Sequence, residues 1–181
     1  MSDSLKINPA ILPEEGLRLS FSEDAAWFKK CFAVDELPEF SLIRADVECL
    51  INRMGETIYI RGNLTAKINQ ECSRCLESAT LTVAGDFAYT LVPEKAGVAE
   101  EDMELTAEDL ETGHYSGDFI DLGPLVCEQI VLQAPMRVLC AEDCKGLCPR
   151  CGKNLNTGSC NCHSGVVDDR LAVLKNFRVK N

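Results

Sequence analysis

The sequence predicts an α+β, β-rich fold with an antiparallel meander sheet, one or two packed helices and a C-terminal cysteine-rich zinc-binding segment. Three observations lead to this prediction. Three long segments between residues 41 and 91 alternate apolar and polar residues, which is typical of half-buried strands. Short connections join these segments, which favours antiparallel neighbours. Six cysteines then fall within residues 140–162.

The elements before residue 92 follow from periodicity and turn residues. Leu17–Phe21 alternates as a short strand, and Ser22-Glu23-Asp24 is a helix start before a short helix over 25–32. Residues 52–56 form the turn between the first two long strands. Gly85 is the expected position of a bend or bulge in the third. The expected buried faces are Ile43, Ala45, Val47, Cys49 and Ile51; Ile58, Ile60, Leu64, Ala66 and Ile68; and Leu81, Val83, Phe87, Tyr89 and Leu91.

The sequence of the second half of the chain indicates a loop, a strand and two helices. Residues 94–111 contain eight acids and one lysine, which indicates a solvated loop. Residues 114–120 are expected to return as a strand. Asp121 is the expected N-cap of a helix over 122–134. A short terminal helix is expected over 170–177. We therefore divide the chain into 1–135, an antiparallel β-rich domain with helix 122–134, and 136–181, a zinc-binding segment with the terminal helix.

Composition bounds the location of the protein. The chain has 181 residues, of which 46% are hydrophobic, which is enough for a packed core. No apolar stretch is long enough to span a membrane. The N-terminus has no basic region followed by an apolar stretch, so we expect no signal peptide and a cytoplasmic protein. In a reducing compartment, clustered cysteines bind metal more often than they form disulfides.

The cysteine spacing predicts metal ligands. Cys-x-x-Cys places two sulfurs on one tight turn, at a separation that suits two corners of a tetrahedral metal site. A glycine after the second cysteine, as at Gly152, allows the positive φ that such a turn needs. The next cysteine pair lies eight residues beyond this turn. One complete four-sulfur set is therefore Cys148, Cys151, Cys160 and Cys162.

A second set of ligands is expected around the connection between the second and third long strands. That connection holds Cys72 and Cys75, and two thiolates alone leave a metal undercoordinated. The remaining close pair is Cys140 and Cys144, which would join the sheet to the C-terminal segment. We favour this grouping. The alternative pairs Cys72 and Cys75 with Cys148 and Cys151, and leaves Cys140, Cys144, Cys160 and Cys162 for the other site.

Other interpretations of the cysteines compete with zinc. An iron–sulfur cluster also takes four thiolates, but sites closed by four protein ligands with a glycine-ended turn favour zinc, as one or two ions. A redox Cys-x-x-Cys usually opens a helix, whereas Cys72 and Cys75 lie between strands. Cys31, Cys49 and Cys127 are expected to be buried small hydrophobic residues.

Neither catalysis nor a small-molecule substrate is expected. The sequence contains no recognisable nucleophile, phosphate-binding or dinucleotide motif, and a four-thiolate site leaves no open position for an activated water. We therefore expect a protein that is not an enzyme. The net charge is −11, divided into −15 over residues 1–135 and +4 over residues 136–181. Such an acidic body suits a basic protein partner better than nucleic acid.

Four stretches of the chain together resemble the YceD family, also called domain of unknown function 177. They are Cys72–Leu76, Asp121–Val126, Cys144–Asn156 and Asp169–Leu174. They extend, in order, over roughly two thirds of the chain, and the run Asp-Cys-Lys-Gly-Leu-Cys-Pro is the most specific. The resemblance implies a β-rich domain with a metal-linked C-terminal segment and a role in accumulation of large-subunit ribosomal RNA. It implies no catalytic residue.

Two hypotheses of different class follow. The first is an acidic, zinc-stapled ribosome assembly factor that binds a basic ribosomal protein or a large-subunit precursor containing rRNA and protein. Its C-terminal basic residues would contact rRNA: Arg150, Lys153, Arg170, Lys175, Arg178 and Lys180. The second is a thiol-based redox-sensing zinc module.

Overall fold

The computed structural model describes residues 5–33, 36–94 and 112–162. One five-stranded sheet dominates it, with the strand order β2-β3-β4-β5-β6, and a small pair is formed by β1 and β7. The strands are β1 (Lys6–Ile7), β2 (Leu17–Asp24), β3 (Phe40–Met54), β4 (Thr57–Glu71), β5 (Ser78–Pro93), β6 (Thr112–Tyr115) and β7 (Ile120–Asp121). The helices are η2 (Pro9–Ile11), α1 (Ala25–Lys30) and α3 (Leu122–Gln133). The expectation of a sheet-rich fold with few helices is confirmed.

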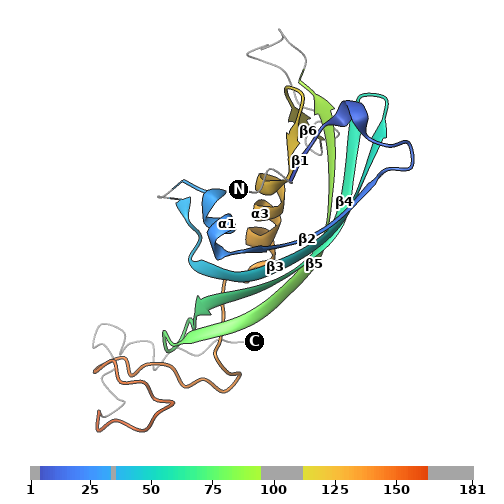
Figure 1. Cartoon of the computed structure of the whole chain (residues 1–181). Coiled ribbons are helices and arrows are strands. Elements are labelled where there is room, and N and C mark those ends of the chain that lie inside the picture. Colours follow the sequence, from blue (N-terminus) through green and yellow to red (C-terminus); the bar gives the residue numbers. More distant parts are fainter. Residues whose placement is uncertain (1–4, 34–35, 95–111, 163–181) are drawn as a thin grey trace, which may run out of the picture.

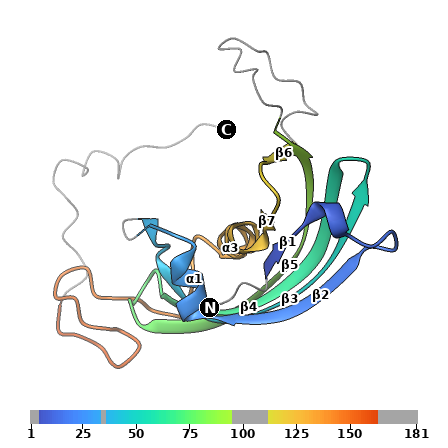
Figure 2. The ribbon, with the colours of Figure 1, turned by 45° about the horizontal axis from the view of Figure 1, so that its top comes forward.

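Strands β3, β4 and β5 form the predicted antiparallel meander. Each is 15 or 16 residues long, and β3 and β4 meet at a tight turn that contains Gly55. The long strands curve around α1 and α3, so that the helices lie on the concave side of the sheet (Figures 1 and 2). The core is formed where the concave face meets these helices, and its fully buried side chains include Ile51, Ile60, Ile68 and Ile130.

Two details of the predicted strand faces are wrong. The expected inner face of β3 begins with Ile43, but Ile43 is 45% exposed and Leu42 is buried instead. The register shifts between Leu42 and Arg44, and a bulge of this kind reverses the side on which the earlier residues lie. Gly85, by contrast, pairs with Leu64 in unbroken register. It is not a bulge, and its missing side chain makes room for Gln133 of α3.

The segment predicted as one strand over 114–120 is divided in two. Strand β6 pairs in parallel with β5, while β7 pairs with β1. Asp121 then caps α3 as expected, because its side chain accepts a hydrogen bond from the Gly123 N–H at 2.9 Å. The sequence pattern had missed the contribution of the N-terminus, where Leu5 and Ile7 enter the core.

The expectation that Cys31 and Cys127 are buried small hydrophobic residues is only partly confirmed, because Cys127 is buried but Cys31 is half-buried. Their sulfurs form a disulfide that ties α1 to α3. The two cysteines are 96 residues apart in sequence, so spacing alone could not pair them. Cys49 is a free, buried cysteine as expected.

Several predictions fall on residues 95–111 and 163–181, which lie outside the described part of the chain. They are the acidic loop and the helix over 170–177. Among the helices of the described residues, none has the length and apolar character needed to cross a membrane.

Candidate metal centre

The cysteines form two groups of four, one that joins the β4–β5 connection to the C-terminal segment and one that lies within that segment. The first cluster consists of Cys72, Cys75, Cys140 and Cys144, and the second of Cys148, Cys151, Cys160 and Cys162. Within each cluster all four sulfurs lie within 4.8 Å of one another. The structure thus brings the cysteines together in the favoured grouping and not in the alternative one.

The sulfur spacing of the first cluster fits a tetrahedral ion. Cys72 Sγ lies 3.7 Å from Cys144 Sγ, and Cys75 Sγ lies 3.5 Å from Cys140 Sγ. An ion with four metal–sulfur bonds of about 2.3 Å would hold its sulfurs about 3.8 Å apart. Cys72, Cys75 and Cys144 are buried, whereas Cys140 is exposed. The donor set is therefore suited to a closed structural site with one ligand at the surface.

A tight turn at the end of β4 presents the first two sulfurs. The Cys72 N–H donates to Glu77 O at 2.8 Å, and the Leu76 N–H donates to Cys72 O at 2.9 Å. Leu76 adopts a φ of 62°, which is unusual for a side chain other than glycine. The turn brings both cysteines to the same side, toward the C-terminal segment.

The two residues between these cysteines bind the C-terminal segment. The Ser73 N–H donates to Val138 O at 2.8 Å, and Arg74 donates to Cys144 O at 2.9 Å from its guanidinium. The Leu147 N–H returns a bond to Arg74 O at 3.0 Å. Gly146 permits this approach, because a Cβ there would lie 3.0 Å from Arg74 O. Both Cys140 and Cys144 are thereby placed beside the β4–β5 turn.

The second cluster begins with a turn of the same kind. The Cys148 N–H donates to Lys153 O at 2.8 Å, and the Gly152 N–H donates to Cys148 O at 2.9 Å. Gly152 has a φ of 71°, as the sequence predicted. This cluster is more open than the first, since only Cys148 is buried. Its ligands all come from one short stretch of chain.

In each cluster, the first cysteine of the Cys-x-x-Cys turn has a lowered pKa. Burial opposes ionisation of Cys72, but backbone N–H groups of Arg74, Cys140 and Cys75 together lower its pKa to about 6. Backbone N–H groups of Cys151 and Arg150 lower the pKa of Cys148 to about 6 as well.

Cys140 and Cys162 are harder to ionise because neighbouring thiols surround them. Cys75 and Cys144 raise the pKa of Cys140 to about 12, and Cys151 raises that of Cys162 to about 12. Crowded thiolates repel one another, and a divalent cation among them would remove that repulsion. The donor chemistry of both clusters therefore fits a metal ion.

A hollow of about 540 Å³ lies beside the first cluster. The exposed Cys140 lines it together with Glu77, Asp143, Lys145, Asn154 and Asn156. Solvent therefore reaches the first cluster from the Cys140 side.

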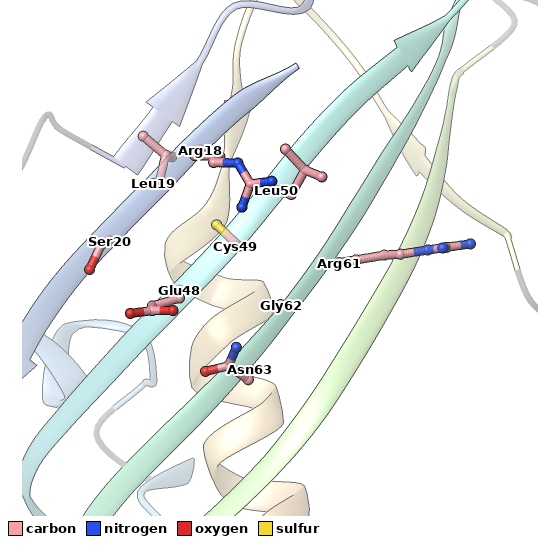
Figure 3. A pocket seen from close by; sticks show the side chains of 9 residues that line it. All are labelled: Arg18, Leu19, Ser20, Glu48, Cys49, Leu50, Arg61, Gly62 and Asn63. Carbon is pink, nitrogen blue, oxygen red and sulfur yellow. The ribbon is translucent and has the colours of Figure 1, made fainter. Parts of the chain in front are cut away.

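A second hollow, of about 320 Å³, lies on the sheet and is lined by nine residues of β2, β3 and β4 (Figure 3). Arg18, Leu50 and Arg61 form one cross-strand row along it, and Ser20, Glu48 and Asn63 form another row two positions away. Cys49 also lines this hollow. Its side chain is 7% exposed, and burial raises the pKa of its thiol. A thiol of that kind stays protonated at neutral pH and is a poor nucleophile.

The family comparison matches residues 60–178 to the model described as large ribosomal RNA subunit accumulation protein YceD. The chain belongs to the YceD family. The matched region includes all eight cysteines of the two clusters, together with most of β4 and all of β5 and α3. The YceD region thus carries both candidate metal sites, while β2, β3 and α1 lie before it.

The curated relatives of the chain are distant in sequence. An uncharacterized protein of Mycobacterium tuberculosis strain H37Rv is 29% identical over 133 residues, which is 71% of this chain and 59% of the relative. A chloroplastic protein of Arabidopsis thaliana, named large ribosomal RNA subunit accumulation protein YCED homolog 1, is 24% identical over 80% of this chain and 51% of its own length. The protein YlbN of Bacillus subtilis is 38% identical over 69 residues, covering 38% of this chain and 40% of the relative.

The chain spans between about half and three fifths of the length of the first curated relatives that it matches. No solved structure matches it significantly.

Proposed function

We propose that this chain is a non-enzymatic, cytoplasmic zinc-binding factor that supports accumulation of large-subunit ribosomal RNA during ribosome assembly. The observation that carries the proposal is membership of the YceD family over a region that contains both cysteine clusters. The relatives named for rRNA accumulation supply the biological role. The two cysteine clusters are the basis for proposing that the chain binds zinc.

Zinc at these clusters would act as a structural cross-link. Four thiolates close the coordination shell and leave no position for a reacting water. An ion in the first cluster would join the β4–β5 turn to residues 140–144, and one in the second would close the stretch from 148 to 162. Structural zinc contributes ~10–16 kcal/mol of apparent binding free energy in zinc-finger peptides at neutral pH. That amount is comparable to the stability of a whole domain, ~5–15 kcal/mol.

Charge suggests a basic ribosomal protein, or a precursor that contains one, as the partner. Residues 1–135 carry −15, which attracts a basic surface and repels phosphate. A bound zinc ion with four thiolates adds a further −2 per cluster, so the C-terminal region is not strongly basic when loaded. Only a few basic side chains would then be available to contact rRNA. Arg150 is exposed, while Lys153 already donates to Ser159 O at 2.8 Å.

The role in assembly is tested by deleting the gene in its own host and measuring the ratio of large- to small-subunit rRNA. We expect the ratio to fall and the intact chain to restore it. The tagged protein at its endogenous level should co-sediment with large-subunit precursors in low salt. An unchanged ratio together with absence from those fractions would contradict the proposal.

The metal is tested separately by elemental analysis of anaerobically purified protein. We expect two zinc atoms per chain, one for each cluster. Iron with inorganic sulfide in place of zinc would replace the structural interpretation with a redox one.

A redox-sensing module is the second candidate function, and the exposure of Cys140 and Cys151 favours it. Accessible thiolates that hold zinc can be oxidised to disulfides with release of the metal. Mild peroxide should then release zinc reversibly, and unchanged zinc content under oxidant would remove this candidate.

A further inference from the structure

Asn156 belongs to the second cluster by sequence but contacts the first cluster in space. It lies in the connection between Cys151 and Cys160. Its side-chain Nδ2 nevertheless donates to Cys144 Sγ at 3.3 Å. A ligand of one cluster is thus hydrogen-bonded by the loop that closes the other.

The orientation of the Asn156 amide is determined by its other contacts. The Lys145 N–H donates to Asn156 Oδ1 at 2.7 Å, so the amide nitrogen is the atom that faces the sulfur. The Asn156 N–H donates to Asn154 Oδ1 at 2.9 Å, and the Asn154 amide donates to Glu77 Oε1 at 3.3 Å. The loop is therefore fitted against both the β4–β5 turn and residue 145.

The loop has little apolar packing of its own. None of residues 151–160 is buried. Its backbone is linked to the first cluster through the Leu155 N–H, which donates to Gly146 O at 2.9 Å, and through an antiparallel bridge between Leu147 and Asn154. A segment with so few buried contacts depends on its ends for order, and its ends are cysteines of the second cluster.

An N–H group directed at a metal-bound thiolate stabilises the charged sulfur and holds it in position. In agreement with this, the Asn156 amide is the leading cause that lowers the pKa of Cys144. The amide can act in this way only while the loop is held in place.

We propose that Asn156 is a positioning residue that couples the two metal sites, so that metal in the second cluster strengthens metal binding by the first. This inference rests on the proposed zinc sites. Metal at Cys148, Cys151, Cys160 and Cys162 holds both ends of the loop, and the loop then presents the amide to Cys144. By linkage, metal in the first cluster strengthens binding by the second to the same degree.

The test is a double-mutant cycle on metal affinity. The affinity of the first cluster for Zn²⁺ is measured on the full chain by competition with a chromophoric chelator, with Co²⁺ absorption as an independent report of thiolate coordination. One mutation is Asn156→Ala, and the other disables the second cluster through Cys151→Ser with Cys162→Ser. We expect each to weaken the first cluster by ~10–100-fold, the range for loss of an outer-shell partner. Together they should weaken it no further than either alone.

Two further variants keep the test independent of misfolding. Asn156→Asp preserves the oxygen that accepts from Lys145 but places a carboxylate oxygen against the sulfur, so it should weaken the first cluster at least as much as Asn156→Ala. The control is Asn63→Ala, which replaces an asparagine of β4 that lines the hollow on the sheet. It should leave the Zn²⁺ affinity of the first cluster unchanged. The fluorescence of Trp27, the single tryptophan, reports whether the sheet remains folded.

The outcomes separate this inference from the proposed function. If the intact chain binds no metal at either cluster, the proposed zinc sites and their coupling both fail. If it binds two ions but the Asn156 variants leave the first-cluster affinity unchanged, or if the effects simply add, the coupling is overturned and the zinc sites stand.

Discussion

Leu76 and Gly152 occupy the same position in two copies of one turn. Each directly follows the second cysteine of a Cys-x-x-Cys pair, with φ of 62° and 71° respectively. Each donates its N–H to the carbonyl of the first cysteine at 2.9 Å. In both turns the N–H of the first cysteine donates to the residue five positions on, at 2.8 Å. The chain therefore builds the same ligand-bearing turn twice, once with glycine and once with leucine.

The leucine version of the turn carries a conformational cost that glycine would avoid. A residue with a Cβ pays ~1–2 kcal/mol in this region, while glycine loses ~0.5–1 kcal/mol more entropy on folding. Leu76 is 60% exposed, so its removal sacrifices little packing. We expect Leu76→Gly to raise the free energy of unfolding by up to ~1 kcal/mol, measured by denaturant titration with excess zinc. Gly152→Ala is the opposite change and should lower it by ~1 kcal/mol. Destabilisation by Leu76→Gly would show that the leucine side chain has a contact partner.

Loss of a cysteine should have different consequences in the two clusters. Cys151 is exposed and belongs to a cluster made from one stretch, so Cys151→Ala should release one metal ion and loosen that stretch while the sheet stays folded. Cys75 is buried and belongs to the cluster that joins the β4–β5 turn to the C-terminal segment. Cys75→Ala should therefore lower the melting temperature more and detach residues 136–162 from the sheet. Measurements of metal content and of Trp27 fluorescence on heating distinguish the effects of Cys151→Ala and Cys75→Ala. Unchanged metal content and melting temperature in Cys75→Ala would contradict the bridging role.

The sheet could be predicted because its signals are local. Alternation with a period of two identifies the buried face of each long strand, and β4 follows it over its whole length. The prediction failed where a single-residue shift intervened: the bulge after Leu42 turns Ile43 outward. It also failed where partners are distant, as for Cys31 and Cys127 or for β1 and β7. Periodicity carries no information about such pairs.

The cysteine clusters could be predicted only as far as their spacing allowed. Cys-x-x-Cys identifies two ligands on one turn, but the choice of partner pair depends on how the segments meet in space. The contacts of Ser73 and Arg74 with residues 138–147 determine which cysteine pair completes the first cluster. A serine or an arginine in the sequence does not by itself predict such contacts. Asn156 was not expected to matter, because an asparagine in a turn-rich stretch is ordinary and its contact with Cys144 is tertiary.

Metal affinity should depend on pH with a break near 6. Zinc binds thiolates, so each protonated cysteine must lose a proton when the metal binds. Above pH 6, Cys72 and Cys148 are already ionised, because their pKa values are lowered from 9.0 to about 6. Below that pH their protons must be displaced as well, so zinc affinity should fall more steeply as pH decreases. The same lowering means that their ionisation stabilises the metal-free fold fully above pH 9, and this contribution is lost as pH falls through 6.

The pH prediction is checked by chelator competition at pH values on both sides of 6, with proton release measured at each. The number of protons released per zinc ion should rise as pH is lowered. A constant number across this range would mean that neither thiol is ionised ahead of the others.

The disulfide between Cys31 and Cys127 should stabilise the sheet domain independently of metal. It closes a loop of 96 residues and joins α1, which has six residues, to α3. A disulfide of this kind typically contributes ~2–4 kcal/mol, so Cys127→Ser should lower the free energy of unfolding by about that amount without changing metal content. The denatured, unreduced chain should show nine free thiols. A count of eleven would mean that the pair is reduced in the isolated protein.

Two glycines of the sheet should respond differently to the same substitution, because different atoms face them. A Cβ at Gly62 would lie 2.6 Å from Glu48 O and 2.6 Å from Phe87 Cζ, and the backbone carbonyl cannot move without disturbing the β3–β4 pairing. Gly62→Ala should therefore cost ~1–3 kcal/mol, the usual range for overpacking. The three atoms nearest a Cβ at Gly85 would all belong to the end of the flexible Gln133 side chain, which can swing aside. Gly85→Ala should be close to neutral, or stabilising by up to ~1 kcal/mol through lower entropy of the unfolded chain.

Denaturant unfolding of Gly62→Ala and Gly85→Ala, monitored by Trp27 fluorescence, tests both expectations. Equal losses of stability would mean that Gln133 is held as firmly as the Glu48 backbone, and α3 would then be a rigid part of the sheet's inner face.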